Sequence, residues 1–224
     1  MSYLFWVALV AGTMSSVAHA QISPGGKPDL QKEVAALEAH CGYALDPVLQ
    51  ANVTAFQSDV KNNIFSIRFS LNMRPGKRLV AADLTFGCFV PGSSMVHDAG
   101  AGTTASEEIA LEDAGGRYAR HVAWERSYEG VNWGGTIAYA DAIAGDGQRQ
   151  PIPGYFLVCP SPDRPNSACF SLEVRKPRLT KRESDAIPAL LHPVRLAHTA
   201  ELGHDHSPNP PTVNPYSSTP PQSR

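Results

Sequence analysis

The sequence predicts an α+β fold, mostly β, in which an antiparallel sheet or sandwich is built from hairpins. Apolar residues recur with a period of two from residue 64 onward, which is typical of half-buried strands. Helical spacing is confined to the first part of the chain and to a short segment at residues 180–191. The even number of cysteines predicts two disulfides. Together these observations predict N-terminal helices, a disulfide-linked sheet and a short C-terminal helix.

Residues 1–20 have the pattern of a cleavable signal peptide. An apolar stretch over residues 3–12 is followed by an A-x-A cleavage signature that ends at Ala20. The stretch is too short to span a membrane, although a buried N-terminal helix is an alternative interpretation. We therefore expect cleavage after Ala20 and a soluble mature protein, periplasmic or secreted, with no membrane span.

The mature part is long enough for one domain of ordinary size. We expect a single disulfide-stapled domain over residues 21–196 and a disordered tail, rich in proline, serine and histidine, over residues 197–224. With 19 basic and 21 acidic residues the chain carries a formal charge of −2, which gives no case for a nucleic-acid partner. No motif calls for a cofactor.

Two helices are predicted before the sheet. Residues 28–40 place apolar side chains on one face and charged ones elsewhere, as in an amphipathic helix. Asp46 and Pro47 then provide an N-cap and a proline at the first helical position, and helical spacing of apolar residues continues to Val60. An extended conformation at residues 52–54 is the alternative.

Three hairpins are predicted next. Residues 64–71 and 80–86 alternate around Pro75-Gly76, which sets Arg68 opposite Asp83. A two-residue turn at Glu129-Gly130 joins the second pair and sets Trp124 across from Gly135. The third ribbon joins residues 155–159 to residues 169–174.

The third ribbon also predicts a disulfide, because its register sets Cys159 directly opposite Cys169. Cys41–Cys88 then follows by exclusion, although the sequence alone allows three connectivities. No C-x-x-C is present, which argues against a thiol oxidoreductase and against the usual structural zinc spacing.

The connecting segments are less regular. Residues 91–106 have the composition of a loop, and residues 107–113 are predicted to form a short strand. Thr180 and Glu183 have the spacing of a capping box, so we expect the C-terminal helix to begin there.

Aromatic residues on one face of the second hairpin are a candidate binding surface, formed by Trp124, Tyr128 and Trp133. The same face carries valine and isoleucine, so packing in the core is the alternative role.

The tail provides a candidate metal site, because imidazoles bind zinc, copper and nickel. Its ligands would be His198, His204 and His206. A disordered tail has no further shell of residues to hold such ligands, so a solvated tail is the alternative. A basic cluster at residues 175–182 is interpreted in the same way, as a contact for an anionic partner or as a solvated connector.

No catalytic residue is assigned, because the sequence lacks the G-x-S-x-G, H-E-x-x-H, P-loop and S-x-x-K patterns. We therefore expect an exported binding protein of inhibitor, immunity or adaptor type, whose partner is another exported or envelope protein. The alternatives are a secreted hydrolase with no recognisable motif, built around His97 or His121, and metal handling through the histidine-rich tail.

Overall fold

The computed structural model describes residues 27–90, 104–161, 168–176 and 178–197. The predicted signal peptide and all of the predicted tail except Ala197 lie outside the described residues. The predicted fold class is confirmed: the described part of the chain is mostly β and antiparallel, with four helices and two disulfides. The helices are α1 (Lys27–Cys41), α2 (Pro47–Gln50), α3 (Ala105–Glu112) and α4 (Lys181–Leu191). The strands are β1 (Tyr43–Leu45), β2 (Val53–Lys61), β3 (Ile64–Met73), β4 (Val80–Phe89), β5 (Ala119–Glu129), β6 (Gly134–Gly145), β7 (Gln148–Pro160), β8 (Phe170–Val174) and β9 (Val194–Leu196).

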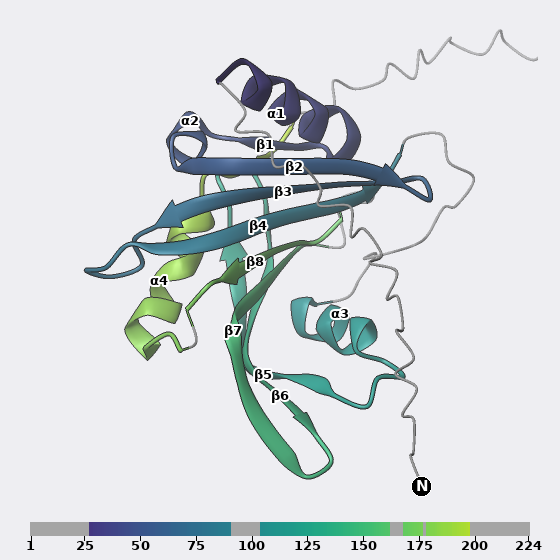
Figure 1. The fold of residues 1–224 in the computed structure, drawn as a ribbon, viewed down its shortest axis with the longest axis vertical. Coiled ribbons are helices and arrows are strands. Elements are labelled where there is room, and N and C mark those ends of the chain that lie inside the picture. The colour runs from purple at the N-terminus through teal and green to yellow at the C-terminus, as the bar shows by residue number, and fades with distance from the viewer. Residues whose placement is uncertain (1–26, 91–103, 162–167, 177, 198–224) are drawn as a thin grey trace, which may run out of the picture.

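Seven strands form one antiparallel sheet in the order β2-β3-β4-β8-β7-β6-β5 (Figure 1). Among the described residues, β2 and β5 are the two edge strands of this sheet, and β1 and β9 form a separate two-stranded ribbon. The short strand β8 pairs with β4 on one side and with β7 on the other. It therefore joins the β2–β4 hairpins to the β5–β7 hairpins.

The first predicted helix is confirmed as α1, whereas the second is mostly wrong. Asp46 does cap α2, because its side chain accepts a hydrogen bond from the backbone N–H of Val48 at 2.9 Å. The helix ends after one turn at Gln50, and residues from Val53 onward form strand β2 along β3. Pairing with β3 satisfies the backbone groups on one side of this segment, and its apolar side chains pack against the core, so tertiary context overrides its helical spacing.

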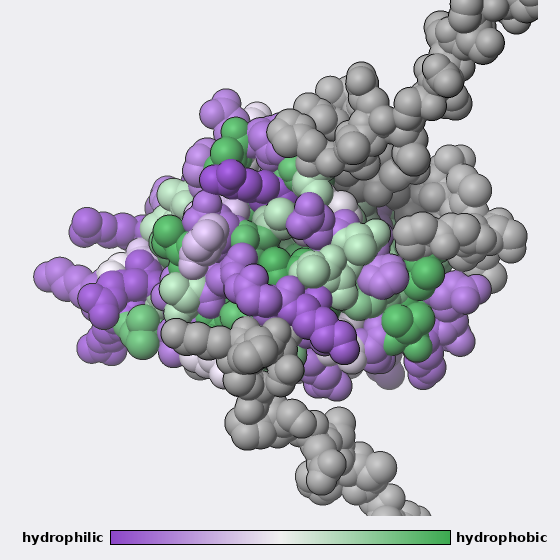
Figure 2. Space-filling model, turned by 90° about the horizontal axis from the view of Figure 1, so that it is seen from above, coloured by the Kyte–Doolittle hydropathy of each residue, from purple (hydrophilic) through white to green (hydrophobic). Residues whose placement is uncertain are grey.

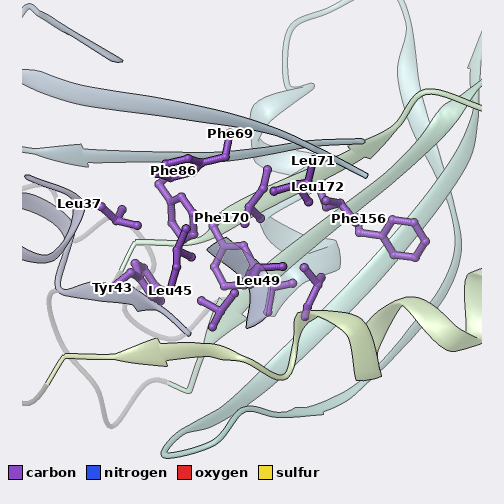
Figure 3. Packing of buried hydrophobic residues seen from close by; sticks show 14 of the residues in the cluster. Leu37, Tyr43, Leu45, Leu49, Phe69, Leu71, Phe86, Phe156, Phe170 and Leu172 are labelled. Atoms are coloured by element: carbon purple, nitrogen blue, oxygen red, sulfur yellow. The ribbon is translucent and has the colours of Figure 1, made fainter. Parts of the chain in front are cut away.

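The larger core lies on the face of the sheet that is covered by α1, α4 and the β1–β9 ribbon. Tyr43 of β1 is 1% exposed, and its ring lies 5.2 Å from Phe86 and 5.4 Å from Phe170. Figure 3 shows these rings meeting between the ribbon and the sheet, with Leu37 of α1 beside them. Burial of these side chains fixes which face of each strand points inward.

The opposite face of the sheet is covered in part by α3, at a position where a strand was predicted. That prediction is wrong because Thr104 and Glu107 form a capping box, which starts a helix instead. Ile109 of α3 packs with Ala138 and Leu157 in a second, smaller core. These residues follow core-facing neighbours on β6 and β7, as expected from the alternation along a strand.

The second hairpin forms with a different register from the predicted one. Tyr128 lies across from Gly135, and Trp124 lies across from Tyr139. The turn is longer than two residues because the backbone N–H of Gly130 donates to the carbonyl oxygen of Trp133 at 2.8 Å. The third hairpin has the predicted register.

The first hairpin differs from the prediction by two residues. Arg68 lies opposite Thr85, and Asp83 lies opposite Ser70, whose hydroxyl donates to the Asp83 carboxylate at 2.8 Å. Since the shift is an even number of residues, the apolar side chains stay on the predicted face.

Both predicted disulfides are confirmed. Cys159–Cys169 links β7 to the segment just before β8, with Cα atoms 4.3 Å apart. Cys41–Cys88 links the end of α1 to β4, with Cα atoms 5.4 Å apart. The two bridges close loops of different length, because their cysteines are 10 and 47 residues apart in sequence.

Removing the longer bridge is expected to cost more stability than removing the shorter one. Loop-closure entropy predicts a loss of about 4 kcal/mol for the double variant Cys41→Ala/Cys88→Ala and about 3 kcal/mol for Cys159→Ala/Cys169→Ala. Urea unfolding of both variants and of the oxidised chain checks this. An equal or larger loss from the shorter bridge would contradict the entropic account.

Gly135 is required where β6 approaches β7. A Cβ atom at this position would overlap the carbonyl oxygen of Cys159 and the Cα atom of Pro160, both of which are backbone atoms. We expect Gly135→Ala to lower the free energy of unfolding by about 1–3 kcal/mol. Gly87→Ala is the matched control, because a Cβ atom there meets nothing within 4 Å. Similar stability losses for the two variants in thermal unfolding would contradict this.

Candidate functional site

A groove lies beside the C-terminal end of α3, on the face of the sheet that α3 covers, with a volume of about 360 Å³. We call it the α3 groove. Its lining residues come from the turn after α3 and from β5, β6, β7 and β8. They are Asp113, Tyr118, Arg120, Ile143, Ile152, Pro153, Tyr155 and Glu173.

Hydrogen bonds at both ends hold α3 against the sheet. At its N-terminal end, the backbone N–H groups of Ala105 and Ser106 donate to Thr136 Oγ1 and Glu125 Oε1, both at 2.8 Å. At its C-terminal end, Asp113 is the C-cap, and Gly115 turns the chain with a φ of +82° that glycine tolerates. The reversal brings β5 back beside Asp113.

Arg120 is held in the groove by two carboxylates. Its Nε and Nη2 atoms donate to Asp113, with a shortest distance of 2.7 Å, and Nη2 also donates to Glu112 Oε2 at 2.7 Å. The backbone N–H of Arg120 donates to Asp113 Oδ2 at 2.6 Å. The guanidinium carbon lies 4.4 Å from the centroid of the Tyr155 ring. The arginine is therefore fixed by a bidentate pair and a ring face.

The ionisation of this cluster follows from those contacts. Burial alone would raise the pKa of Asp113, but hydrogen bonds from the side chain and backbone of Arg120 outweigh burial and lower it. Burial and the nearby Glu112 carboxylate raise the pKa of Tyr155 to about 12. At neutral pH the groove therefore holds a charged aspartate, a charged arginine and a neutral tyrosine.

The other side of the groove is apolar. Ile143, Ile152 and Pro153 line it, and Tyr118 adds a ring that is 47% exposed. A bulge between Ala140 and Ala142 changes the pairing of β6 with β7, so Ile143 lies on the groove side of the sheet. The groove thus combines a charged wall with an apolar one.

Exposed apolar residues also occur away from the groove. Leu111, which precedes Glu112 on α3, is 60% exposed. Other large exposed apolar side chains are distributed over several elements: Val48, Val60, Ile64, Leu79 and Val131. Seen from the side of α1, hydrophilic residues surround smaller hydrophobic areas (Figure 2).

The aromatic surface predicted from the second hairpin is largely buried. Tyr128 is 2% exposed and donates its hydroxyl to the carbonyl oxygen of Leu191 at 2.8 Å. Trp133 is 6% exposed and donates its Nε1–H to the carbonyl oxygen of Val194 at 3.0 Å. Trp124 is half-buried under the guanidinium of Arg126, at 4.2 Å. Tyr128 and Trp133 are therefore core residues, as in the alternative interpretation.

The basic cluster near the C-terminal helix is mostly paired. Arg175 binds Asp83 at 2.7 Å, and Lys176 binds Glu183 at 2.7 Å. Lys181 binds an acidic residue one helical turn away. These pairs agree with a solvated connector.

The histidines singled out in the sequence do not form a site within the described residues. His97 and the tail histidines His198, His204 and His206 lie outside the described residues. His121 is exposed, and its Nε2 lies 3.5 Å from Nη1 of Arg149. Within the described part of the chain, no group of three or more histidine, cysteine or acidic side chains is arranged to hold a metal ion.

Sequence reasoning missed the groove residues Asp113, Arg120, Tyr155 and Glu173. One readable signal was available, because Thr104 and Glu107 have capping-box spacing and would have placed a helix before Asp113. Comparisons with protein-family models, curated proteins and solved structures gave no match.

Asp113 is expected to stabilise the fold in a pH-dependent way. Its folded-state pKa is lowered, so its contribution is present above the unfolded value of about 3.8 and is lost as the pH falls through the folded-state pKa. We expect Asp113→Asn to cost about 1–3 kcal/mol at pH 7 and less near pH 3. Urea unfolding of both proteins across this range checks the prediction. A difference independent of pH would contradict it.

Proposed function

We propose that this chain is an exported binding protein of inhibitor, immunity or adaptor type, which contacts another exported or envelope protein through the α3 groove. The observation that carries the proposal is the groove itself, which combines a fixed charged wall with an apolar wall. Interfaces use such a combination, since apolar contact supplies free energy and fixed charges supply orientation.

Rigidity of the charged wall favours recognition. Arg120 is bound by Asp113 and Glu112 and lies over Tyr155, so little side-chain entropy remains to be lost when a partner docks. The exposed ring of Tyr118 adds an aromatic contact at the groove. Tyrosine and arginine are the residue types that most often carry binding energy at protein interfaces.

The lining set offers little for catalysis. It contains no serine, threonine, cysteine, histidine or lysine among the described lining residues, and its one carboxylate free of an ion pair, that of Glu173, has no neighbouring nucleophile there to activate. Asp113 is held ionised by Arg120, and the high pKa of Tyr155 keeps its proton in place near neutral pH. Binding is therefore the function that the groove supports best.

Export is part of the proposal. It is supported by the A-x-A signature at residue 20 and by the two disulfides, which persist in oxidising compartments. Among the helices that the structure describes, none has the length and apolar character to cross a membrane.

The groove is expected to be required for partner retention. The oxidised mature chain is immobilised and exposed to envelope extract and culture fluid of the host, and retained proteins are identified by mass spectrometry. We expect a stoichiometric partner that Tyr118→Ser loses and that Leu79→Ser keeps, because Leu79 is 56% exposed but outside the groove. Retention of no partner would contradict the binding function, and equal retention by both variants would contradict the groove as its site.

A further inference from the structure

The charges around the α3 groove do not cancel. Glu112, Asp113 and Glu173 are acidic, whereas Arg120 is the basic residue that the two adjacent carboxylates already bind. The charged residues beside the groove lie in two groups, and Arg68 also interacts electrostatically with Asp83. Arg117 binds Asp146 at 2.7 Å beside Tyr118, and Arg175 donates both Nε and Nη2 to Asp83. Among the described residues that line the groove, the two carboxylates of Asp113 and Glu173 exceed the single guanidinium of Arg120, so the lining has an excess of negative charge.

Glu173 is the acidic residue that stays available. It lies on β8 opposite Tyr155 and is exposed, and its side chain makes no hydrogen bond or ion pair within the described residues. Arg175 lies close enough to interact electrostatically, but its hydrogen bonds go to Asp83. A carboxylate at the wall of a groove, with its hydrogen-bonding capacity unused, can accept a donor from a partner.

The apolar wall of the groove suits the hydrocarbon part of a side chain whose end donates a hydrogen bond to Glu173. Ile143, Ile152 and Pro153 provide a surface for methylene groups, and the ring of Tyr118, which is 47% exposed, extends this apolar surface. Lysine and arginine combine an apolar stem with a cationic head, so they match both walls at once. An acidic residue would meet three carboxylates, and a purely apolar one would leave Glu173 without a partner.

Resting on the proposed function, we infer that the α3 groove takes a basic side chain, lysine or arginine, from an apolar segment of the partner protein. The cationic head lies against Glu173, and the stem lies along Ile152 and Pro153. The same charge excess excludes an acidic segment from the groove.

Blocked tripeptides Ile-X-Ile, with arginine, lysine, citrulline or glutamate at X, test the inference. They are titrated into the isotope-labelled, oxidised mature chain and followed by nuclear magnetic resonance. We expect the arginine and lysine peptides to shift the backbone amide signals of Arg120, Ile152 and Tyr155. Citrulline keeps the shape of arginine without its charge, so we expect it to bind more weakly by about fivefold. The glutamate peptide is expected to leave the signals unchanged.

Two variants distinguish the effect of a charge in the groove on peptide affinity from the effect of the net charge of the protein. We expect Glu173→Gln to weaken binding of the arginine peptide by about two- to fivefold. Asp59→Asn removes the same charge from the exposed edge strand β2 and is expected to leave the affinity unchanged. Added salt should weaken the arginine peptide and spare the citrulline peptide. An unshifted amide spectrum of Glu173→Gln outside the groove confirms that the variant is folded.

Equal affinities for arginine and citrulline, signal shifts outside the groove, or equal effects of Glu173→Gln and Asp59→Asn would each overturn the inference. The proposed function has a separate readout. If a partner is retained by the unchanged protein and lost by Tyr118→Ser, the proposed binding function stands even when the peptides show no preference for positive charge. Retention of no partner removes the function, and with it the biological basis of this inference.

Discussion

The structure depends on the pairing of β8 with both of its neighbours. This strand has five residues, yet it is the element that joins the β2–β4 hairpins to the β5–β7 hairpins within the described sheet. Its inward side chains Phe170, Leu172 and Val174 are at most 1% exposed. Without it, β4 and β7 would both present unpaired edges in the middle of the molecule. The Cys159–Cys169 disulfide ties the chain to β7 just before this strand begins.

The positions of the groove residues on β7 and β8 depend on the pairing of these two strands. The register of β7 with β8 sets Glu173 beside Tyr155, and the inward residues of the two strands fix this register in the core. Asp113 and Arg120 are placed by local structure. The C-cap of α3 and the glycine turn after it bring Arg120 within hydrogen-bonding distance of Asp113. The proposed binding site therefore depends both on the long-range pairing of β7 with β8 and on the short-range turn after α3.

The sequence predicted the third hairpin best, because its two strands and its loop are close together in the chain. The register of the third hairpin and the Cys159–Cys169 disulfide followed from the alternating residues on either side of one loop, and Cys41–Cys88 then followed by exclusion. The turn of the second hairpin did not, because Tyr128 and Trp133 donate hydrogen bonds to Leu191 and Val194, more than 60 residues away in sequence. The groove escaped prediction for the same reason, since β8 reaches it only through the sheet order.

Native-state amide hydrogen exchange tests most directly whether β8 unites the two hairpin groups. The amides of Leu84 in β4, Leu172 in β8 and Phe156 in β7 lie in adjacent paired positions across the centre of the sheet. If β8 makes the sheet one cooperative unit, all three amides exchange with the same free energy of opening, equal to that of global unfolding. A lower value for Phe156 than for Leu84 would show that the β5–β7 group opens by itself and would contradict the account.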